Sequence, residues 1–293
     1  MLRKLLYLGF FIGGLLCLTL VYLINTVINR PNFVAPGQLS ETDYKEFTAT
    51  SSDGITIHAI FYAGAPDADT VLLCHGHGVN LNYMDDMVKF LRVAGYNLLM
   101  LDFRAHGRSG GKLCSIGVHE WQDIKAAMAK ARELGYLRED SSIAAYGRSM
   151  GAATLINGAR ELPEISAFIL ESSFATLRLV AANDAYNTAW LPDTPMSDLV
   201  IWLTGILARI DFAGNRPVEQ AKHLADRAVF LIHDELDSRA DLKQFEMLKL
   251  SMPHARTWVS PNSWHVCAHK KNPVEFEGKF LDFLFSAGIV GRR

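Results

Sequence analysis

The sequence lacks an excess of either charge. Its 293 residues include 29 Lys and Arg against 31 Asp and Glu, which gives a formal net charge of −2. Binding to nucleic acid depends on clustered positive charge that displaces counterions from the phosphates. The even balance therefore gives no reason to expect a nucleic-acid partner.

Cysteine is scarce, and its spacing argues against two classes of protein. The four cysteines are Cys17, Cys74, Cys114 and Cys267, and no C-x-x-C pair occurs among them. Cys17 falls in an apolar run, which leaves an odd number in the rest of the chain. We therefore expect small buried side chains rather than a disulfide framework or a zinc ribbon.

Charge is missing altogether from one segment near the N-terminus, the 24 residues from Leu5 to Ile28. A helix of this length can cross a hydrocarbon core of about 30 Å. Arg3 and Lys4 precede the run and favour a catalytic part on the non-cytoplasmic side. A signal peptide has a shorter apolar region of about 7 to 15 residues and a small-residue cleavage site, and no such site follows closely. We predict a membrane anchor over residues 1–30, with a cleaved signal or a buried helix as alternatives.

The segments that follow are typical of an α/β protein. Residues 31–43 contain two prolines, a glycine and polar side chains, and predict a linker. Residues 46–50 and 55–62 alternate in polarity around Asp53-Gly54, which predicts an antiparallel strand pair. Short apolar runs, typical of strands buried on both faces of a parallel sheet, come next. These runs are residues 70–74, 97–101, 142–146, 167–171, 228–232 and 256–260.

Amphipathic stretches of helical length separate most of these runs. The alternation predicts the α/β class, with a doubly wound, mostly parallel sheet and right-handed crossovers. Between Phe174 and Arg227 the strand pattern stops and apolar helical segments replace it. We expect this insertion, about residues 175–226, to form a helical cap over the functional edge of the sheet. The sequence thus predicts one α/β domain over residues 44–293.

Residues 147–151, G-R-S-M-G, offer a nucleophile. They follow an apolar run and precede a stretch rich in small residues. A G-x-S-x-G pattern between strand and helix is a sharp, strained turn that exposes the serine hydroxyl. A serine needs a base to react at neutral pH, normally a histidine that a carboxylate orients. We predict that Ser149 is the nucleophile.

The acid and the base are expected at the carboxyl ends of later strands, in that order. The candidates after the last two apolar runs are Asp234, Glu235, Asp237, Asp241, His265 and His269. His265 is the preferred base because it lies in a loop, whereas His269 falls toward the final helix. Asp237 is the preferred acid because it lies far enough beyond the strand to reach the histidine loop. Asp234 and Glu171 remain alternatives for the acid.

Two histidines in C-H-G-H-G, His75 and His77, allow a metal site or an oxyanion turn. Neither the H-x-H-x-D-H arrangement of binuclear metallohydrolases nor H-E-x-x-H is present. Acyl transfer instead needs main-chain N–H donors that face the carbonyl oxygen. Gly76 and Gly78 would let the turn come close to the substrate. We predict that the N–H groups of His77 and Met150 form an oxyanion hole and that His75 is structural.

The glycine-rich loop at residues 102–111 could suggest a phosphate site. It lacks the lysine of G-x-x-x-x-G-K-[ST], and G-x-G-x-x-G is absent as well. We expect Asp102, Arg104 and His106 to hold this loop beside the active site by hydrogen bonds. The sequence predicts neither a cofactor nor a metal.

Together these motifs resemble the serine hydrolases of the α/β-hydrolase superfamily. The segments HGHGVN, DFRAHGRSGG, GRSMGAA, LESSF, IHDELD and SWHV occur in the family's order across residues 44 to 288. The resemblance implies an α/β-hydrolase fold. It also implies a nucleophile at Ser149, an acid at Asp237, a base at His265 and oxyanion amides at His77 and Met150.

The chain departs from the family at three places. Asp234 stands where the family usually has glycine, Ala240-Asp241 replaces the usual Val-Pro, and Ala105 replaces a glycine. Two of these departures fall in the acid loop, so we expect that loop to have an unusual shape.

The sequence as a whole favours a membrane-anchored serine hydrolase. It would cleave an ester, thioester or similar acyl bond in a small or lipid-like substrate, through an acyl-enzyme. A serine peptidase of the aminopeptidase type is the nearest alternative. A non-catalytic binding protein on a hydrolase scaffold is the second. The pattern indicates no oligomeric state.

Overall fold

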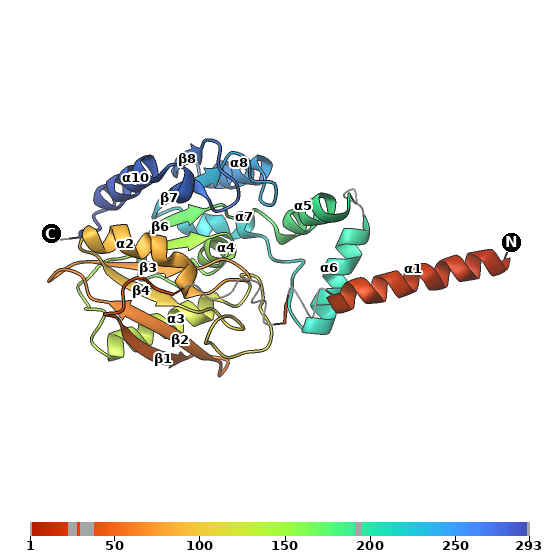
Figure 1. Cartoon of the computed structure of the whole chain (residues 1–293), viewed down its shortest axis with the longest axis horizontal. Helices are drawn as coiled ribbons and strands as arrows, with labels where there is room; N and C mark the ends of the chain where they lie inside the picture. The colour runs from red at the N-terminus through yellow and green to blue at the C-terminus, as the bar shows by residue number, and fades with distance from the viewer. Residues whose placement is uncertain (1, 23–27, 30–37, 191–194, 292–293) are drawn as a thin grey trace.

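A sheet of eight strands forms the centre of the protein (Figure 1). The computed structural model describes residues 2–22, 28–29, 38–190 and 195–291. The strand order is β1-β2-β4-β3-β5-β6-β7-β8, with β1/β2 and β2/β4 antiparallel and the other neighbouring pairs parallel. The predicted mostly parallel sheet is confirmed. Its strands are β1 (Lys45–Thr50), β2 (Thr56–Tyr62), β3 (Thr70–Cys74), β4 (Asn97–Leu101), β5 (Ile143–Arg148), β6 (Ile165–Glu171), β7 (Ala228–Asp234) and β8 (Arg256–Ser260).

Helices cover both faces of the sheet, because successive side chains of each buried strand point to opposite sides. On one face Leu72 and Phe168 belong to a cluster with side chains of α3, α4 and α8. On the other face Leu73 and Tyr146 pack with side chains of α2 and α10. These helices are α2 (Asp85–Val93), α3 (Trp121–Glu133), α4 (Met150–Asn157), α8 (Leu242–Ser251) and α10 (Pro273–Ser286). The doubly wound arrangement expected from the alternation is therefore present.

The predicted insertion is helical. It contains α5 (Leu177–Ala189), α6 (Pro195–Ala208), α7 (Pro217–Gln220) and the short 3-10 helix η3 (Ala221–Leu224). The apolar side chains of Ile201 and Phe212 lie in one cluster with Phe174 and with Ala153 of α4. Because α4 begins directly after Ser149, this cluster packs the insertion against the helix that follows the predicted nucleophile. Ala221 and Leu224, by contrast, belong to the core cluster on the face of the sheet that α3, α4 and α8 cover.

The N-terminal segment forms helix α1 (Leu2–Tyr22), which lies against α6 (Figure 1). Of the predicted span, residues 23–27 lie outside the described part of the chain, as do residues 30–37 of the predicted linker. None of the helices within the described ranges is both long and apolar enough to cross a membrane. The described residues therefore give no support to the predicted anchor. The non-cytoplasmic location stays a prediction.

Ile28 itself reaches the α/β domain. Its side chain is buried in the cluster that contains Phe174 and Phe212. Its carbonyl oxygen accepts a hydrogen bond of 2.7 Å from the N–H of Cys114. Ile28 therefore packs with side chains of the insertion in that cluster.

Candidate active site

Ser149 occupies the turn between β5 and α4. Its φ of 52° and ψ of −114° lie outside the conformations that a side chain normally allows. The flanking glycines are required by close packing. A β-carbon on Gly151 would overlap the carbonyl oxygen of Cys74, and one on Gly147 would overlap the main chain of Gly151 and Ala152. The turn therefore has the strained geometry expected of a nucleophile elbow.

The structure brings Ser149, His265 and Asp237 into a continuous hydrogen-bonded chain. Ser149 Oγ lies 2.8 Å from His265 Nε2, and His265 Nδ1 lies 2.6 Å from Asp237 Oδ2. A carboxylate can only accept, so Nδ1 carries the imidazole proton and Nε2 is free to accept from the serine hydroxyl. The three residues selected from the sequence thus have the geometry of a serine-hydrolase triad.

Main-chain donors hold the Asp237 carboxylate in place. Its Oδ1 accepts from the N–H groups of Arg239 at 2.9 Å and Ala240 at 3.0 Å. Burial raises the pKa of Asp237, but the hydrogen bonds from His265 and from the Arg239 N–H outweigh it, and the net pKa lies below the ordinary value. The carboxylate is therefore ionised at neutral pH.

Asp234 and Glu171, the alternative acids, bond to residues other than the imidazole of His265. Asp234 accepts from Ser172 Oγ at 2.6 Å and from the N–H of Val266 at 2.9 Å. The Glu171 carboxylate contacts Tyr146 Oη, and its Oε2 lies 3.3 Å from Arg148 Nε. Burial raises the pKa of both carboxyl groups. Asp234 thus supports the loop that carries His265, and Glu171 belongs to a separate network.

Arg148, for which the sequence analysis predicted no role, forms the centre of the network that contains Glu171. It is buried and makes a bidentate ion pair with Asp86 of α2 at 2.6 and 2.9 Å. Asp86 also contacts Nδ1 of His269, whose Nε2 lies 2.9 Å from Glu277. A charged residue directly before the nucleophile, at the end of an otherwise apolar strand, was the available signal. His269 is therefore engaged by carboxylates, while His265 contacts Ser149.

The loop after β3 passes beside the nucleophile. A β-carbon added at Gly76 would lie 3.6 Å from Cβ of Ser149 and 3.5 Å from the carbonyl oxygen of Arg148. Met150 is the first residue of α4, where main-chain N–H groups have no partner within the helix. Both segments predicted to supply oxyanion donors therefore border Ser149.

A protein-family comparison identifies the chain. The family described as serine aminopeptidase, S33, matches residues 65–274, which include all five predicted site residues. The chain belongs to this hydrolase family.

Relatives of this hydrolase cover most of its length. The uncharacterized protein YqkD of Bacillus subtilis is 27% identical over 246 residues, covering 81% of this chain and 78% of YqkD. The uncharacterized protein YfhR of Escherichia coli is 26% identical, with 83% and 80% covered. Among solved structures, esterase Pf2001 of Pyrococcus furiosus is 27% identical with a TM-score of 0.72, covering 89% of this chain and 98% of the esterase. The protein DcsB, solved in complex with its substrate analogue, shares the fold at 15% identity and a TM-score of 0.64, covering 84% of this chain and 99% of DcsB.

His75 and His77, in the turn after β3, were the candidates for a metal site in this S33-family hydrolase. His75 is buried; its Nδ1–H donates to the carbonyl of Gly76 at 2.7 Å, and its Nε2 accepts from the N–H of Phe103 at 3.0 Å. Burial lowers the pKa of His75 to about 3, so the ring is neutral. Both nitrogens are engaged, and a structural role is the one that the geometry supports.

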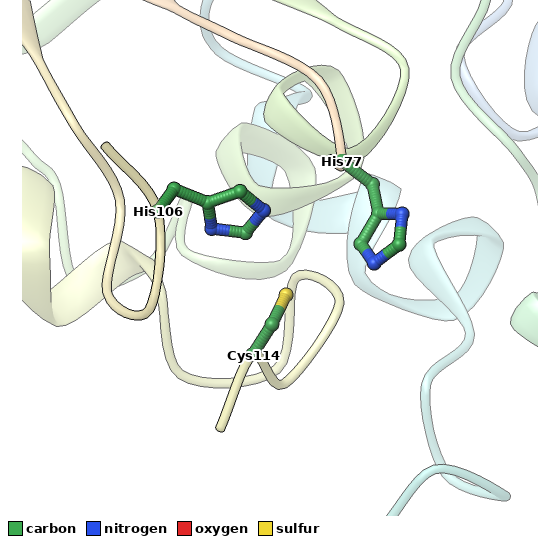
Figure 2. A group of neighbouring side chains, drawn as sticks. All are labelled: His77, His106 and Cys114. Carbon is green, nitrogen blue, oxygen red and sulfur yellow. The ribbon is translucent and has the colours of Figure 1, made fainter. Parts of the chain in front are cut away.

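His77 lies instead near His106 and Cys114 (Figure 2), with potential ligand atoms within 4.8 Å of one another. His106 Nδ1–H donates to the carbonyl of Arg104 at 2.9 Å, and its Nε2 accepts from the N–H of Gly78 at 3.1 Å. A metal would have to displace that N–H and leave it without an acceptor. Burial also raises the pKa of the Cys114 thiol, which keeps it protonated. The arrangement favours a hydrogen-bonded cluster over a metal centre.

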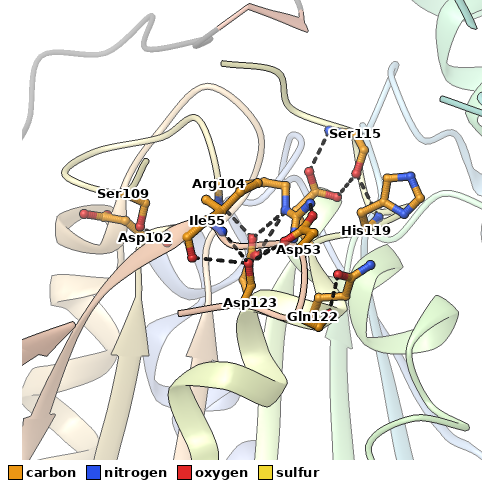
Figure 3. A network of polar contacts seen from close by, with 12 residues as sticks. Asp53, Ile55, Asp102, Arg104, Ser109, Ser115, His119, Gln122 and Asp123 are labelled. Atoms are coloured by element: carbon orange, nitrogen blue, oxygen red, sulfur yellow. Dashed lines mark hydrogen bonds and ion pairs between the residues drawn. The ribbon is translucent and has the colours of Figure 1, made fainter. Parts of the chain in front are cut away.

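The loop at residues 102–111 is held by a dense polar network (Figure 3). The Asp102 carboxylate accepts from the main-chain N–H of Leu81 at 2.8 Å and contacts Nδ1 of His58 at 2.9 Å. Arg104 pairs with Asp123 at 2.7 Å and with Asp53 at 2.6 Å. The hydrogen bonds expected at Asp102 and Arg104 are present, and they fix the loop beside the turn that carries His77.

Proposed function

We propose that the protein is a serine hydrolase that cleaves an ester, thioester or similar acyl bond. The observation that carries the proposal is the hydrogen-bonded chain from Ser149 through His265 to Asp237. Membership of an S33 hydrolase family and the likeness to an esterase of 27% identity support it.

The geometry supports an acyl-enzyme mechanism. His265 Nε2 accepts the proton of Ser149 Oγ as the oxygen attacks the carbonyl carbon, and the N–H groups of His77 and Met150 stabilise the oxyanion. The imidazolium then protonates the leaving alcohol or thiol as the acyl C–O or C–S bond breaks. His265 next deprotonates water, which attacks the acyl-enzyme and releases the carboxylic acid and the free serine.

The charges of the insertion favour a neutral acyl substrate over a peptide with a free N-terminus. An aminopeptidase has to hold the substrate ammonium group, and an available carboxylate would suit that task. The acids of helices α5 and α6 are both engaged in ion pairs, Asp184 with Arg239 at 2.8 Å and Asp198 with Arg178 at 2.7 Å. Asp211 accepts from the N–H of Gly214. The insertion also exposes large apolar side chains, including Tyr186, Trp190 and Trp202, which suit an acyl chain.

Two experiments test the proposal. A fluorophosphonate probe should label the wild type at Ser149 and should fail to label Ser149→Ala; equal labelling of both would overturn the mechanism. A chain-length series of p-nitrophenyl esters, compared with aminoacyl p-nitroanilides, tests the bond. We expect faster hydrolysis of the esters, with a dependence on acyl length. Faster hydrolysis of the aminoacyl substrates would establish the aminopeptidase alternative, and a protein that neither labels nor hydrolyses would be a binding protein.

A further inference from the structure

Helix α5, the first helix of the insertion, forms hydrogen bonds with the loop that carries Asp237. Asn183 and Asn187 lie one turn apart on α5, and their side-chain amides donate to the carbonyl oxygens of Arg239 at 2.9 Å and Ser238 at 2.8 Å. Between them, Asp184 accepts two hydrogen bonds from the Arg239 guanidinium, at 2.9 and 2.8 Å. Three polar side chains of one helix thus hold two consecutive residues of the loop. We call these contacts the α5 clamp.

The clamped residues are the ones that position Asp237. The N–H of Arg239 donates to Asp237 Oδ1, and the N–H of Ala240 donates to the same oxygen. The other oxygen, Oδ2, accepts a hydrogen bond from the Nδ1–H of His265. A rotation of the peptide groups around Arg239 would therefore turn the carboxylate away from the imidazole.

Two further contacts tie this loop to the insertion. Buried Gln244 of α8 donates to the carbonyl of Arg239 at 3.3 Å, and its Oε1 accepts from the N–H of Ala175, just before α5. The side chain of Ala240 is buried in the cluster that includes Ile201 of α6. Both polar and apolar contacts therefore connect the insertion to the loop that carries Asp237.

The Asp184–Arg239 pair is exposed, with side-chain accessibilities of 39% and 45%. Exposed pairs of this kind contribute little to the free energy of unfolding, because water screens the charges. Their bidentate geometry nevertheless fixes direction, since two parallel N–H···O bonds allow one orientation of the guanidinium. The effect of the clamp is therefore on the geometry of the loop more than on stability.

We propose that the insertion is a positioning element for the acid: when α5 is seated, the clamp aligns Asp237 with His265, and when α5 lifts, the triad loses its alignment. Asp184, Asn183 and Asn187 are then positioning residues that act through Arg239. The inference rests on the proposed serine-hydrolase function. It couples the closed state of the cap to catalytic competence, so that a cap open to substrate or product has a weakened nucleophile.

The test uses the full chain and a small methyl fluorophosphonate probe that has no acyl chain for the cap to bind. Asp184→Asn removes the charge and one acceptor while keeping the size of the side chain. We expect phosphonylation of Ser149 to slow by about 5- to 20-fold, because a misplacement of about 1 Å can cost about 100-fold and a smaller displacement costs less. The double variant Asn183→Ala/Asn187→Ala should slow it similarly, and Asp184→Glu should recover part of the rate.

Asp198→Asn is the matched control, because it breaks an ion pair of the same kind between α5 and α6 without contacting the acid loop. It should label at the wild-type rate. With a long-chain ester, Asp184→Asn should lower kcat in proportion to the labelling rate. If Asp184→Asn labels at the wild-type rate and only KM for the long ester changes, the cap merely binds substrate and the clamp has no positioning role. If the wild type itself does not label, the serine-hydrolase function fails instead.

Discussion

Ser149 Oγ lies 2.8 Å from His265 Nε2, although 116 positions separate the two residues along the chain. The parallel sheet explains this proximity. Ser149 follows β5, His265 follows β8, and parallel strands end at one edge of the sheet.

Replacement of Ser149 separates catalysis from backbone strain. Ser149→Ala and Ser149→Gly both remove the nucleophile and should lower ester hydrolysis by about 10³-fold or more. Glycine tolerates positive φ, so Ser149→Gly should exceed Ser149→Ala in the free energy of unfolding by about 1 kcal/mol. Urea denaturation of the two variants measures this difference. Equal stability would show that the turn is not strained.

Replacement of Asp237 should lower catalytic activity more than replacement of Asp234. Asp237→Asn leaves His265 without its ionised partner and should lower kcat by about 10⁴-fold. Asp234→Asn weakens the contacts to Ser172 and to the Val266 N–H of the histidine loop but leaves the Asp237–His265 contact in place, and it should lower kcat by about 3- to 30-fold. Steady-state kinetics on one ester compare the two. A loss in Asp234→Asn as large as that in Asp237→Asn would reassign the acid.

His77 should act through its main chain. His77→Ala keeps the N–H group and should hydrolyse esters within about threefold of the wild type, whereas loss of an oxyanion donor costs about 10²- to 10³-fold. Prolonged dialysis against EDTA should leave the rate unchanged as well. A variant that loses both its activity and a bound metal, measured by elemental analysis, would instead establish a metal site at His77, His106 and Cys114.

His269 should make stability depend on pH. Burial lowers its pKa, but hydrogen bonds to Asp86 and Glu277 outweigh burial, and the pKa lies above its ordinary value. A group with a raised folded pKa stabilises the fold fully below its unfolded pKa, about 6.5, and loses this contribution as the pH rises through the folded value. The wild type should therefore exceed His269→Gln most in the free energy of unfolding at pH 6.

This stability difference should shrink toward pH 9. Arg148 also faces Asp86 and opposes the imidazolium charge, but it stays charged across this range. Urea denaturation at pH 6 and pH 9 measures the effect. A difference between the two proteins that is independent of pH would contradict the protonated bridge.

The sequence predicted the parts of the site that depend on strand ends. Ser149, Asp237 and His265 follow buried apolar runs, and the position of such runs in a parallel sheet fixes which edge their successors share. The preference for Asp237 over Asp234 rests on the same geometry, because a residue three positions farther along can reach the neighbouring loop, and Asp237 is the aspartate that contacts His265 Nδ1.

Contacts between distant helices could not be predicted in this way. The α5 clamp depends on how the insertion folds back over Arg239, and nothing in the spacing of Asn183 and Asn187 specifies their partner. Arg148 illustrates a second limit. Its charge in a buried strand indicates a partner, but the partner, Asp86, lies in a helix 62 positions earlier and pairs with it only through tertiary packing. Glu171 was considered as an acid because the chain alone does not show that Tyr146 and Arg148 engage it.

The buried position of Ile28 has a practical consequence for work with the purified enzyme. Trimming the first 30 residues is a common way to simplify expression of a protein with an apolar N-terminus. Here it would remove a buried side chain from the cluster that contains Phe174 and Phe212, and it would leave the N–H of Cys114, whose Sγ contacts Met150, without its acceptor. A trimmed enzyme would then lack packing contacts between its insertion and its active-site loops. Rates measured on it would understate those of the intact chain.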